Sequence, residues 1–459
     1  MFHGSGIKTT IWNRYLLILI FFLLILHPAC TKSDNVWKIH QLTFRAGINH
    51  DLDNNLNFSP DNQWLCYDTR PESGIANSLT IERVHILTGE IDTIYQAPNA
   101  IEDLGPGVAA VSYFPTDDRV IFIHGLDTKK GLAYSKTRRV GAMVEPVIPT
   151  KVMWADARDV TFPYIPGALR GGTHRHEPGG NDGKWVGFTY DDMIMANLGT
   201  DLRTIGVTRL DMPVKVDQNP TGENNDGEGF SVLVVRVTAQ PDPDTNQICR
   251  AFGDSWVGRS GYLKADGTRQ LARGFIAELA NGHHEVFIVD VPQDITQPGP
   301  QGPLQGTKNT FPMPPAGTRQ QRLTFTKSGC LGNVRSDPDG KWLTFRTTDS
   351  ESHMQIFMIS PHGGKPIQLT FLPHGVESEA RWHFSGEYIV YAADHRIYIT
   401  KIVQSHADFA ASIAVTNTFP SSPKNIIWSP NGKYIAFNRE LEGSLQIFII
   451  ETEKRFWQQ

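Results

Sequence analysis

Apolar residues along the chain form short runs in which apolar and polar positions alternate, and most runs end at a turn signal. The stretches "LNFSPDNQWLCYDTR" from residue 56 and "NIIWSPNGKYIAFNRE" from residue 425 each contain two such runs around a Pro, Asp, Asn or Gly turn. A period of two that is broken by turn residues predicts antiparallel β-hairpins. Similar hairpins start at residues 111, 171, 332 and 380, so the chain is predicted to be all-β.

The hairpins repeat at a regular distance. The aligned turn positions Pro338, Phe384 and Pro430 are separated by 46 residues in both intervals. A period of this length is typical of the four-stranded blades of a β-propeller. First strands near residues 54, 110, 173, 248, 332, 379 and 424 predict a seven-bladed β-propeller, with six or eight blades as alternatives.

The two ends of the chain complement each other. Outer strands of two blades carry "QRLTFT" (321–326) and "IQLTF" (367–371), whereas the last copy of the repeat has no such segment. The related "IHQLTF" (39–44) precedes the first hairpin. We therefore expect the N-terminal strand to pair into the last blade and close the ring, which leaves no open sheet edge.

The N-terminal segment has the features of an export signal. Lys8 and Arg14 precede the apolar run 15–26, which is too short for a comfortable membrane span, and Ala29 precedes Cys30. Lipidation at Cys30, plain secretion and an uncleaved anchor all fit this pattern. We predict a signal peptide at 1–30, a linker at 31–36, and a single propeller domain at 37–459 in the periplasm or on the outer membrane.

Composition narrows the classes of function. The 459 residues are 40% hydrophobic and 20% charged, with a formal net charge of −5, so no basic surface for nucleic acid is predicted. Beyond Cys30, only Cys66, Cys249 and Cys330 remain, which predicts buried thiols and no disulfide framework. The polar or Pro-rich stretches 217–229 and 292–317 are predicted to be surface loops.

Polar residues recur where each first strand begins and where each second strand ends. Antiparallel pairing brings these two ends together, and core packing poorly explains charges there. We predict a ligand site at one mouth of the central channel, although salt bridges of Glu377 and Glu379 to Arg335 and Arg381 are an alternative. The predicted ligand-binding residues are Arg70, Asp191, Asp254, Trp256, Asn333, Arg335, Glu377, Glu379 and Arg381.

Two histidines suggest a metal site. His174 and His176 precede a turn, and Asp191 and Asp192 follow the next strand. A period of two puts both imidazoles on one face of a strand, beside the two carboxylates, where His174 and His176 would bind one divalent ion, Mn, Zn or Ca. Alternatively, each histidine hydrogen-bonds a neighbouring blade.

Several enzyme classes lack their motifs. A propeller-linked serine peptidase needs a second domain with a G-x-S-x-G elbow, whereas "GDSWVG" (253–258) has a different spacing and no residues remain for such a domain. Neither a Walker loop nor a dinucleotide glycine motif is present.

Longer stretches resemble known families. "FSPDNQWL" and "WSPNGKYI" resemble the TolB-type propeller superfamily, and "GGTHRHEPGGNDGKWVGFTYDD", "CRAFGDSWVG" and "HEVFIVDVP" resemble a bacterial family of unknown function typified by YidR. The resemblance implies the fold and is silent on activity. A more distant resemblance is to oligogalacturonate lyase, a seven-bladed propeller that holds manganese with His and Gln side chains; only the pair His174 and His176 has a counterpart here.

Two functions follow as hypotheses. The first is an envelope propeller that binds an oligosaccharide or an envelope protein at its polar mouth without chemistry. The second is a metal-dependent lyase or hydrolase of an acidic oligosaccharide, in which Arg335 or Arg381 neutralises a substrate carboxylate. In both, we expect a monomer that contacts the membrane only through a lipid at Cys30.

Overall fold

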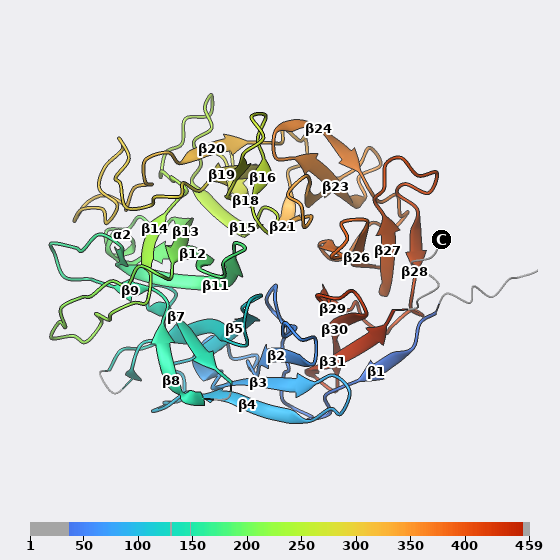
Figure 1. Cartoon of the computed structure of the whole chain (residues 1–459), viewed down its shortest axis with the longest axis horizontal. Helices are drawn as coiled ribbons and strands as arrows, with labels where there is room; N and C mark the ends of the chain where they lie inside the picture. The colour runs from blue at the N-terminus through green and yellow to red at the C-terminus, as the bar shows by residue number, and fades with distance from the viewer. Residues whose placement is uncertain (1–35, 129–130, 147, 453–459) are drawn as a thin grey trace, which may run out of the picture. The chain divides into compact units, whose positions relative to one another are not determined.

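The computed structural model describes residues 36–128, 131–146 and 148–452. In these residues seven antiparallel sheets surround a common centre (Figure 1). All seven lie in one compact unit, Trp37–Gln459. The protein is a seven-bladed β-propeller, so the predicted all-β fold and the count of seven blades are confirmed.

The first four blades follow one another along the chain. Blade 1 contains β2 (Trp64–Asp68), β3 (Thr80–His85) and β4 (Ile91–Gln96). Blade 2 contains β5 (Val108–Tyr113), β6 (Val120–Gly125), β7 (Arg139–Glu145) and β8 (Ile148–Trp154). Blade 3 contains β11 (Gly171–Gly179), β12 (Trp185–Asp192), β13 (Arg203–Arg209) and β14 (Phe230–Leu233). Blade 4 contains β15 (Arg250–Trp256), β18 (Ala272–Glu278), β19 (His284–Asp290) and β20 (Arg319–Arg322).

The last three blades complete the ring. Blade 5 contains β21 (Leu331–Ser336), β22 (Leu343–Thr348), β23 (Met354–Ser360) and β24 (Gly363–Gln368). Blade 6 contains β25 (Arg381–Trp382), β26 (Tyr388–Ala393), β27 (Arg396–Lys401) and β28 (Ser412–Ala414). Blade 7 contains β29 (Lys424–Trp428), β30 (Tyr434–Leu441), β31 (Ser444–Glu451) and β1 (Ile39–Gln41).

Several short elements do not belong to the seven blade sheets. They are the pairs β9 (Ala157–Arg158) with β10 (Ala168–Leu169) and β16 (Tyr262–Leu263) with β17 (Arg269–Gln270), the 3-10 turn η1 (Ile75–Asn77) and the helix α2 (Met193–Asn197). Blade 1 has an irregular inner strand, which pairs with β2 only through the bridges Asp51–Asp68 and Phe58–Leu65.

The ring closes as the sequence predicts. Strand β1 pairs antiparallel with β31, with Ile39 opposite Ile450 and Gln41 opposite Phe448 (Figure 1). One residue further on, the backbone N–H of Leu42 donates to the carbonyl oxygen of Ile447 at 2.8 Å. The first and last parts of the propeller therefore share one sheet.

One turn geometry recurs at the tips of the first hairpins. Its fourth residue has a positive φ: 63° at Asn62, 73° at Gly340, 74° at Gly386 and 67° at Gly432. Its N–H donates back to the carbonyl of the first turn residue, at 2.9 Å for Asn62 and Gly432. Gly and Asn tolerate this backbone region better than other residues, which explains the repeated turn sequence.

The "L-T-F" segments form a second repeated structure, at the outer edge of the blades. In three of them the Thr hydroxyl accepts a backbone N–H of the third strand: Thr43 from Ile447 (2.8 Å), Thr324 from Val286 (2.8 Å) and Thr370 from Ile356 (2.9 Å). In each of these blades a buried polar side chain of the third strand also hydrogen-bonds to the segment or to the residue that follows it. These side chains are Gln446, Glu285 and Gln355, and we call each arrangement the outer corner of its blade. The "L-T-F" pattern is thus a structural signal.

The two long segments predicted to be surface loops pack more closely than expected. Glu223 in 217–229 and Phe311 in 292–317 are buried. Arg170, also buried, donates hydrogen bonds to backbone carbonyls of the second segment. The prediction was wrong for these parts, because a buried guanidinium can satisfy loop carbonyls that water would otherwise solvate.

The prediction of buried thiols is confirmed for two of the three described cysteines and was wrong for Cys249. Cys66 and Cys330 are buried and free, and Cys249 is free and partly exposed. Within the described ranges, no helix has the length and apolar character needed to cross a membrane. The predicted signal peptide, with Cys30, lies outside the described residues.

Candidate ligand-binding site

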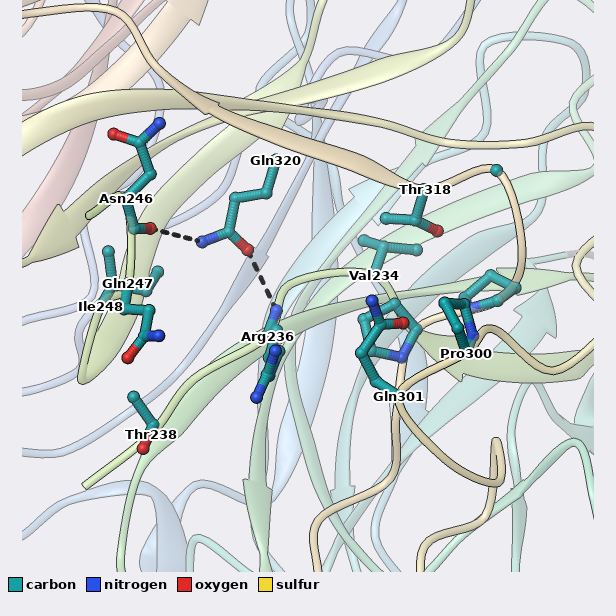
Figure 2. Close-up of a pocket in the computed structure, with 13 residues that line it drawn as sticks. Val234, Arg236, Thr238, Asn246, Gln247, Ile248, Pro300, Gln301, Thr318 and Gln320 are labelled. Carbon is teal, nitrogen blue, oxygen red and sulfur yellow. Dashed lines mark hydrogen bonds between the residues drawn. The ribbon is translucent and has the colours of Figure 1, made fainter. Parts of the chain in front are cut away.

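An outer pocket of about 420 Å³ lies where blade 3 passes into blade 4 (Figure 2). The side chain of Gln320 spans it, since it accepts the N–H of Arg236 at 3.1 Å and donates to the carbonyl of Asn246 at 3.5 Å. Amide side chains and prolines make up most of the lining. None of the predicted site residues lies there, and the centre of the ring is the stronger candidate.

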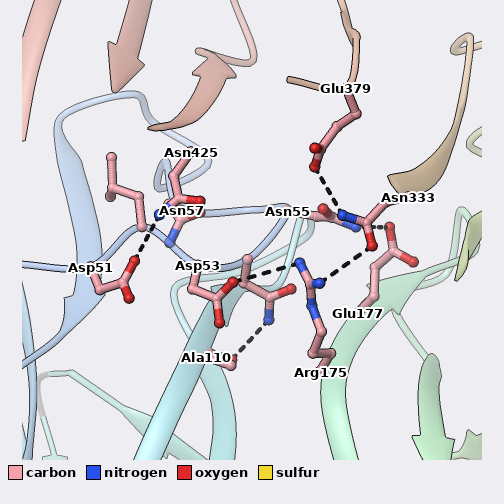
Figure 3. Close-up of polar contacts among 12 residues, drawn as sticks. Asp51, Asp53, Asn55, Asn57, Ala110, Arg175, Glu177, Asn333, Glu379 and Asn425 are labelled. Carbon is pink, nitrogen blue, oxygen red and sulfur yellow. Dashed lines mark hydrogen bonds and ion pairs between the residues drawn. The ribbon is translucent and has the colours of Figure 1, made fainter. Parts of the chain in front are cut away.

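Polar side chains from several blades meet at the centre of the ring (Figure 3). We call this set the central polar network, and its members are Asp51, Asp53, Asn55, Arg175, Glu177, Asn333, Glu379, Arg381 and Asn425. Blades 1, 3, 5, 6 and 7 each contribute at least one of them. The network joins blades that are not neighbours in the ring.

Two chains of contacts cross the ring. Arg381 of blade 6 donates to the Asn55 oxygen at 2.5 Å, and the Asn55 nitrogen donates to Glu177 of blade 3 at 2.7 Å. Arg175 of blade 3 donates to the Asn333 oxygen of blade 5 at 3.3 Å (Figure 3). These bonds span the axis, so polar side chains occupy the channel there.

A β-bulge in β11 makes this arrangement. His174 lies opposite Thr189, whereas Glu177 lies opposite Gly187, so β11 has one residue more than β12 between these pairs. Arg175 has a φ of 54°, which is unusual for a residue other than Gly, Asn or Asp. The bulge directs the side chains of Arg175 and Glu177 to the channel, where both join the network.

A cavity of about 700 Å³ lies next to the network. We call it the central cavity. The turns between first and second strands line it, through residues such as Pro115, Asn181, Pro338 and Pro430, and network members Asn55, Glu177 and Arg381 belong to its wall. The cavity is therefore at the end of the ring where the first strands finish. The sequence predicted a site at the opposite end, where strand starts carry polar residues; there those residues bond to one another across the axis.

The central cavity combines aromatic and charged side chains. Its aromatic residues are Trp256, Trp382, Phe384 and Trp428, and its charged residues are Glu177, Arg259, Arg335, Asp337 and Arg381. Phe384 is 45% exposed, whereas Trp256 is 7% exposed.

Positive charge is concentrated on one wall of the central cavity. Arg335 and Arg381 both contact Glu379, with N–O distances of 3.3 Å and 3.7 Å. Burial opposes ionisation of Glu379, but the two guanidinium groups outweigh burial and lower its pKa. Burial, and next the neighbouring Arg335, lower the pKa of Arg381 to about 9. At neutral pH two cations thus form ion pairs with one carboxylate, while Glu177 attracts both from further away. The Nε of the buried Arg335 has no hydrogen-bond partner.

The part of the wall that blades 3 and 4 form has the reverse charge balance. The buried Arg273 forms ion pairs with both Glu177 and Asp254. Glu177 also accepts the backbone N–H of Trp256 at 3.1 Å, and the Trp256 indole N–H donates to the Glu177 carbonyl at 2.9 Å. One cation shared by two carboxylates holds the Trp256 ring in place, and the Arg273 guanidinium lies 4.8 Å from the ring centre.

The predicted ligand-binding residues divide into groups. Trp256, Arg335 and Arg381 line the central cavity, Asn333 and Glu379 belong to the network, and Asp254 supports the cavity wall through Arg273. The other three are outside it: Arg70 bonds to Asp53 and Asp68, Asp191 to Arg203, and Glu377 lies 3.6 Å from His395.

The histidine pair does not lie beside the two aspartates as expected. Asp191 is paired with Gly172 and Asp192 with Gly171, and the bulge at Arg175 breaks the period of two that would place both imidazoles on one face. His176 is buried and contacts the Thr173 hydroxyl at 2.9 Å. Among the described residues, no three His, Cys, Asp or Glu side chains are arranged to hold a metal ion. The described donor set thus does not fit the predicted metal.

An acidic group stands at the strand-start end of the channel. The buried Asp68 and the partly buried Asp51 pair through their backbones, and Asn425 donates to Asp51 at 2.7 Å. Burial, and next the carboxylate of Asp68, raise the pKa of Asp51 to about 8. Arg70 compensates part of this charge through its bonds to Asp53 and Asp68.

The sequence-based prediction missed Arg175, Glu177 and Arg273. Arg175 and Glu177 were inside the stretch that carries the histidines. That stretch has five polar side chains in succession, Thr173 to Glu177, which does not fit a regular alternation of two faces and was a signal for a bulge. Arg273 lies in the second strand of blade 4, whose sequence between Arg273 and the terminal Glu278 has no other charge, so a charge in a predicted core strand was the available signal.

The fold and the site define a seven-bladed β-propeller with a polar cavity at its centre. The chain belongs to the YidR family. It is 35% identical over 429 residues to "Uncharacterized protein YidR" of Escherichia coli (strain K12), an alignment that covers 90% of this chain and 97% of that protein. A model for a protein family of unknown function, DUF3748, matches residues 107–223. The family resemblance predicted from the sequence is confirmed.

Similarity to solved structures extends over most of the chain. An oligogalacturonate lyase in complex with manganese aligns over 92% of this chain and 94% of that chain, with 12% identity and a TM-score of 0.53. A putative TolB from Agrobacterium tumefaciens aligns over 82% of this chain and 98% of that chain, with 12% identity and a TM-score of 0.37.

Proposed function

We propose that the central cavity binds an acidic oligosaccharide and that binding, without bond cleavage, is the function of the protein. The observation that carries this proposal is the charge on one wall, where Arg335 and Arg381 share the single carboxylate of Glu379. A ligand carboxylate would complete the pairing, because a guanidinium binds a carboxylate with two parallel hydrogen bonds. The unpartnered Nε of Arg335 is a donor that such a ligand would use.

The remaining lining supports a sugar. Aromatic rings such as Trp256, Trp382 and Phe384 offer flat apolar faces, with a polar edge in tryptophan. A volume of about 700 Å³ is within the range of roughly 300–1,000 Å³ typical of small-molecule sites.

A lyase or hydrolase acting on the same ligand is the alternative, and likeness in fold to a manganese-bound oligogalacturonate lyase favours it. The contacts of the cavity argue against it. Of the two buried carboxylates that line the cavity, Glu177 already accepts from Asn55, Trp256 and Arg273, and Asp337 accepts the backbone N–H of Trp342. A general base needs an accessible lone pair near the substrate proton.

Calorimetric titration with defined saccharides tests the proposal. We expect di- and trisaccharides of uronic acids to bind and their neutral hexose counterparts to bind at least tenfold more weakly. Arg335→Met and Arg381→Met should remove this preference, whereas Arg209→Met, which changes an arginine paired with Asp211 outside the cavity, should keep it. Equal affinity for acidic and neutral sugars contradicts the proposal, and binding of neither favours the envelope protein as ligand.

Two measurements separate binding from cleavage. Incubation with uronate oligosaccharides should leave the ultraviolet absorbance of unsaturated products at the blank level. Metal analysis of the purified protein should find no stoichiometric Mn, Zn or Ca. A metal that co-purifies and is lost in the His174→Ala, His176→Ala double variant would support the lyase.

We also propose that the protein is a monomer of the bacterial cell envelope, exported by residues 1–30. The basic residues Lys8 and Arg14, the apolar run 15–26 and the small residue before Cys30 support export. Fractionation of cells that express the wild type and Cys30→Ala distinguishes the outcomes. A lipid anchor predicts a membrane-bound wild type and a soluble variant, and plain secretion predicts that both are soluble.

A further inference from the structure

Two long connections build the outer pocket. Residues 234–249 join β14 to β15, and residues 291–318 join β19 to β20. Loops longer than about 12–15 residues that have no helix or strand of their own are uncommon in compact domains, and those that are ordered are usually functional. Both connections line the outer pocket, which shares no lining residue with the central cavity. The pocket is therefore a separate candidate site.

Contacts with the blades hold the longer connection in place. Its Leu304 is buried in the hydrophobic core that blades 3 and 4 share. The buried Arg170 donates hydrogen bonds to two of its backbone carbonyls. The N–H of Ala316 donates to the carbonyl of Gln297 at 2.9 Å, which joins the two arms of the connection. The fold thus fixes the wall of the pocket, and a preorganised wall lowers the entropic cost of binding.

One charge and several amides line the outer pocket (Figure 2). Arg236 is the charged residue among the described residues of the lining, and it is exposed. Its backbone N–H donates to Gln320, whereas its guanidinium forms no ion pair or hydrogen bond with the part of the chain that the structure describes. Side-chain amides come from Asn246, Gln247, Gln301 and Gln320. The described lining thus offers one cation and no carboxylate, which favours a ligand with a negative charge.

Hydrogen-bonding groups of the outer pocket lack partners in the described structure. The Oγ1 atom of Thr318 is buried and has no hydrogen-bond partner. Buried hydroxyl groups normally have one, and an unpaired group opposes folding. The side-chain amides of the exposed Asn246 and Gln301 form no hydrogen bond with the described residues. A ligand in the pocket would satisfy the Thr318 hydroxyl and bond to these amides.

We propose that the outer pocket binds the carboxyl end of a peptide chain. Arg236 would pair with the terminal carboxylate, since a guanidinium and a carboxylate form strong charge-assisted hydrogen bonds. The amide side chains would bond to the peptide groups of the ligand, because both kinds of group combine an N–H donor with a carbonyl acceptor. A free amino end would find no partner, since no carboxylate is among the described lining residues. Capture of a terminal carboxylate is a recurring mode of peptide recognition.

The surroundings of the pocket favour a peptide over a sugar acid. Asn246 and Gln320 also line an adjoining groove of about 530 Å³ along β20, the outer strand of blade 4, which in the described sheet pairs only with β19. Such an edge strand presents unpaired N–H and C=O groups to which an extended peptide can add. No aromatic residue is among the described residues that line the outer pocket, so a sugar ring would find no flat apolar face there. The chain before the carboxyl end would therefore lie along β20, where Arg319 adds positive charge.

Calorimetric titration of the full-length protein with N-acetylated tetra-alanine tests the proposal. We expect the peptide with a free carboxyl end to bind in the millimolar range or tighter. Its carboxyl-terminal amide should bind at least tenfold more weakly, because the amide has no charge to pair with Arg236. Removal of the N-acetyl group should leave the affinity unchanged. Two aspartates added before the alanines should tighten binding, and Arg319→Gln should remove this gain.

Substitutions in the pocket have matched controls. Arg236→Gln should remove the preference for the free carboxyl end over the amide. Thr318→Val keeps the shape of the side chain, removes the unpaired hydroxyl, and should weaken binding about threefold or more. Arg250→Gln changes an arginine outside the pocket and the groove, 4.0 Å from Glu278, and should bind the peptide like the wild type. Arg335→Met, in the central cavity, should also bind it like the wild type.

The outcomes separate the two sites and the two classes of ligand. Glucuronate has a carboxylate and no peptide group, and it should not displace the peptide; displacement at equal concentration would assign the pocket to a sugar acid and overturn the proposal. The proposal is also overturned if the peptide and its amide bind equally, if neither binds, or if Arg236→Gln keeps the preference. Loss of peptide binding in Arg335→Met would place the peptide in the central cavity and overturn it as well.

Discussion

The hydroxyl of Thr43 accepts the backbone N–H of Ile447 at 2.8 Å, although 404 residues separate them in the chain. This bond belongs to the seam between the N-terminal strand and the last blade, next to the pairing of β1 with β31. The seam is also the place where the first hairpin meets the last, so its stability is tied to that of the whole ring.

We expect Thr43→Val to lower the free energy of unfolding by about 1–3 kcal/mol, because the buried N–H of Ile447 loses its acceptor while the side-chain shape is kept. Urea unfolding followed by tryptophan fluorescence measures the change. Phe44→Ser is the control, since Phe44 is 72% exposed, and it should stay within about 0.5 kcal/mol of the wild type. Equal free energies of unfolding for Thr43→Val and the wild type would contradict a stabilising role of this hydrogen bond.

Gly179 tests the wall of the central cavity. A Cβ atom at this position would lie 2.2 Å from the Trp256 indole nitrogen, so Gly179→Ala must displace the ring. The variant should lose the bond from the indole to the Glu177 carbonyl, shift the tryptophan emission and cost about 1–3 kcal/mol. Gly274→Ala is the matched control, because its nearest neighbour atom is a Val334 methyl at 3.1 Å. Unchanged emission in Gly179→Ala contradicts the arrangement of this wall.

The outer corner of blade 4 has a carboxylate where the equivalent corners of blades 5 and 7 have a side-chain amide. Glu285 is fully buried and accepts from Thr324, from the N–H of Thr326 and from Arg322, where blades 5 and 7 carry Gln355 and Gln446. We expect Glu285→Gln to cost no more than about 1 kcal/mol and Glu285→Ala about 3 kcal/mol, since truncation leaves several buried donors without partners. Thermal unfolding of both variants measures this difference, and equal losses would contradict it.

The fold was predictable because its signals are local and repeated. The positive φ at Asn62, Gly340, Gly386 and Gly432 explains why turn residues recur at fixed positions, and these turns set the strand boundaries. The closure was predictable for a related reason, since the segment 39–44 repeats an outer strand whose role other blades reveal.

The site was less predictable because one extra residue changes which way side chains point. A period of two places His174 and His176 together, but the bulge at Arg175 inserts a residue and directs Arg175 and Glu177 to the axis instead. Nor does the sequence show which end of the channel stays open. Which end is open depends on how far the polar side chains extend across the channel. Toward the strand starts, Arg175 and Asn333 bond across the axis.

Buried histidines should make the protein sensitive to acid. Burial lowers the pKa of His50, His124 and His383 to about 4 and that of His176 to about 3, whereas all four have a pKa of about 6.5 in the unfolded chain. Between these values the unfolded chain binds more protons, so stability rises with pH. We expect the urea midpoint to fall as the pH is lowered from 6.5 to 4. A midpoint that is constant over this range contradicts the burial of these imidazoles.

Asp51 should produce the opposite slope above neutrality. Its pKa is raised to about 8, whereas an unfolded Asp titrates near 3.9. The folded protein therefore holds a proton that the unfolded chain releases, and the stability that this proton contributes is lost as the pH rises toward 8. Asp51→Asn keeps an oxygen that accepts from Asn425 and has no proton to lose. We expect the wild type to lose stability between pH 6.5 and 8.5 and the variant to lose less, as measured by urea midpoints at both pH values. Parallel losses in the two proteins would mean that another group titrates there.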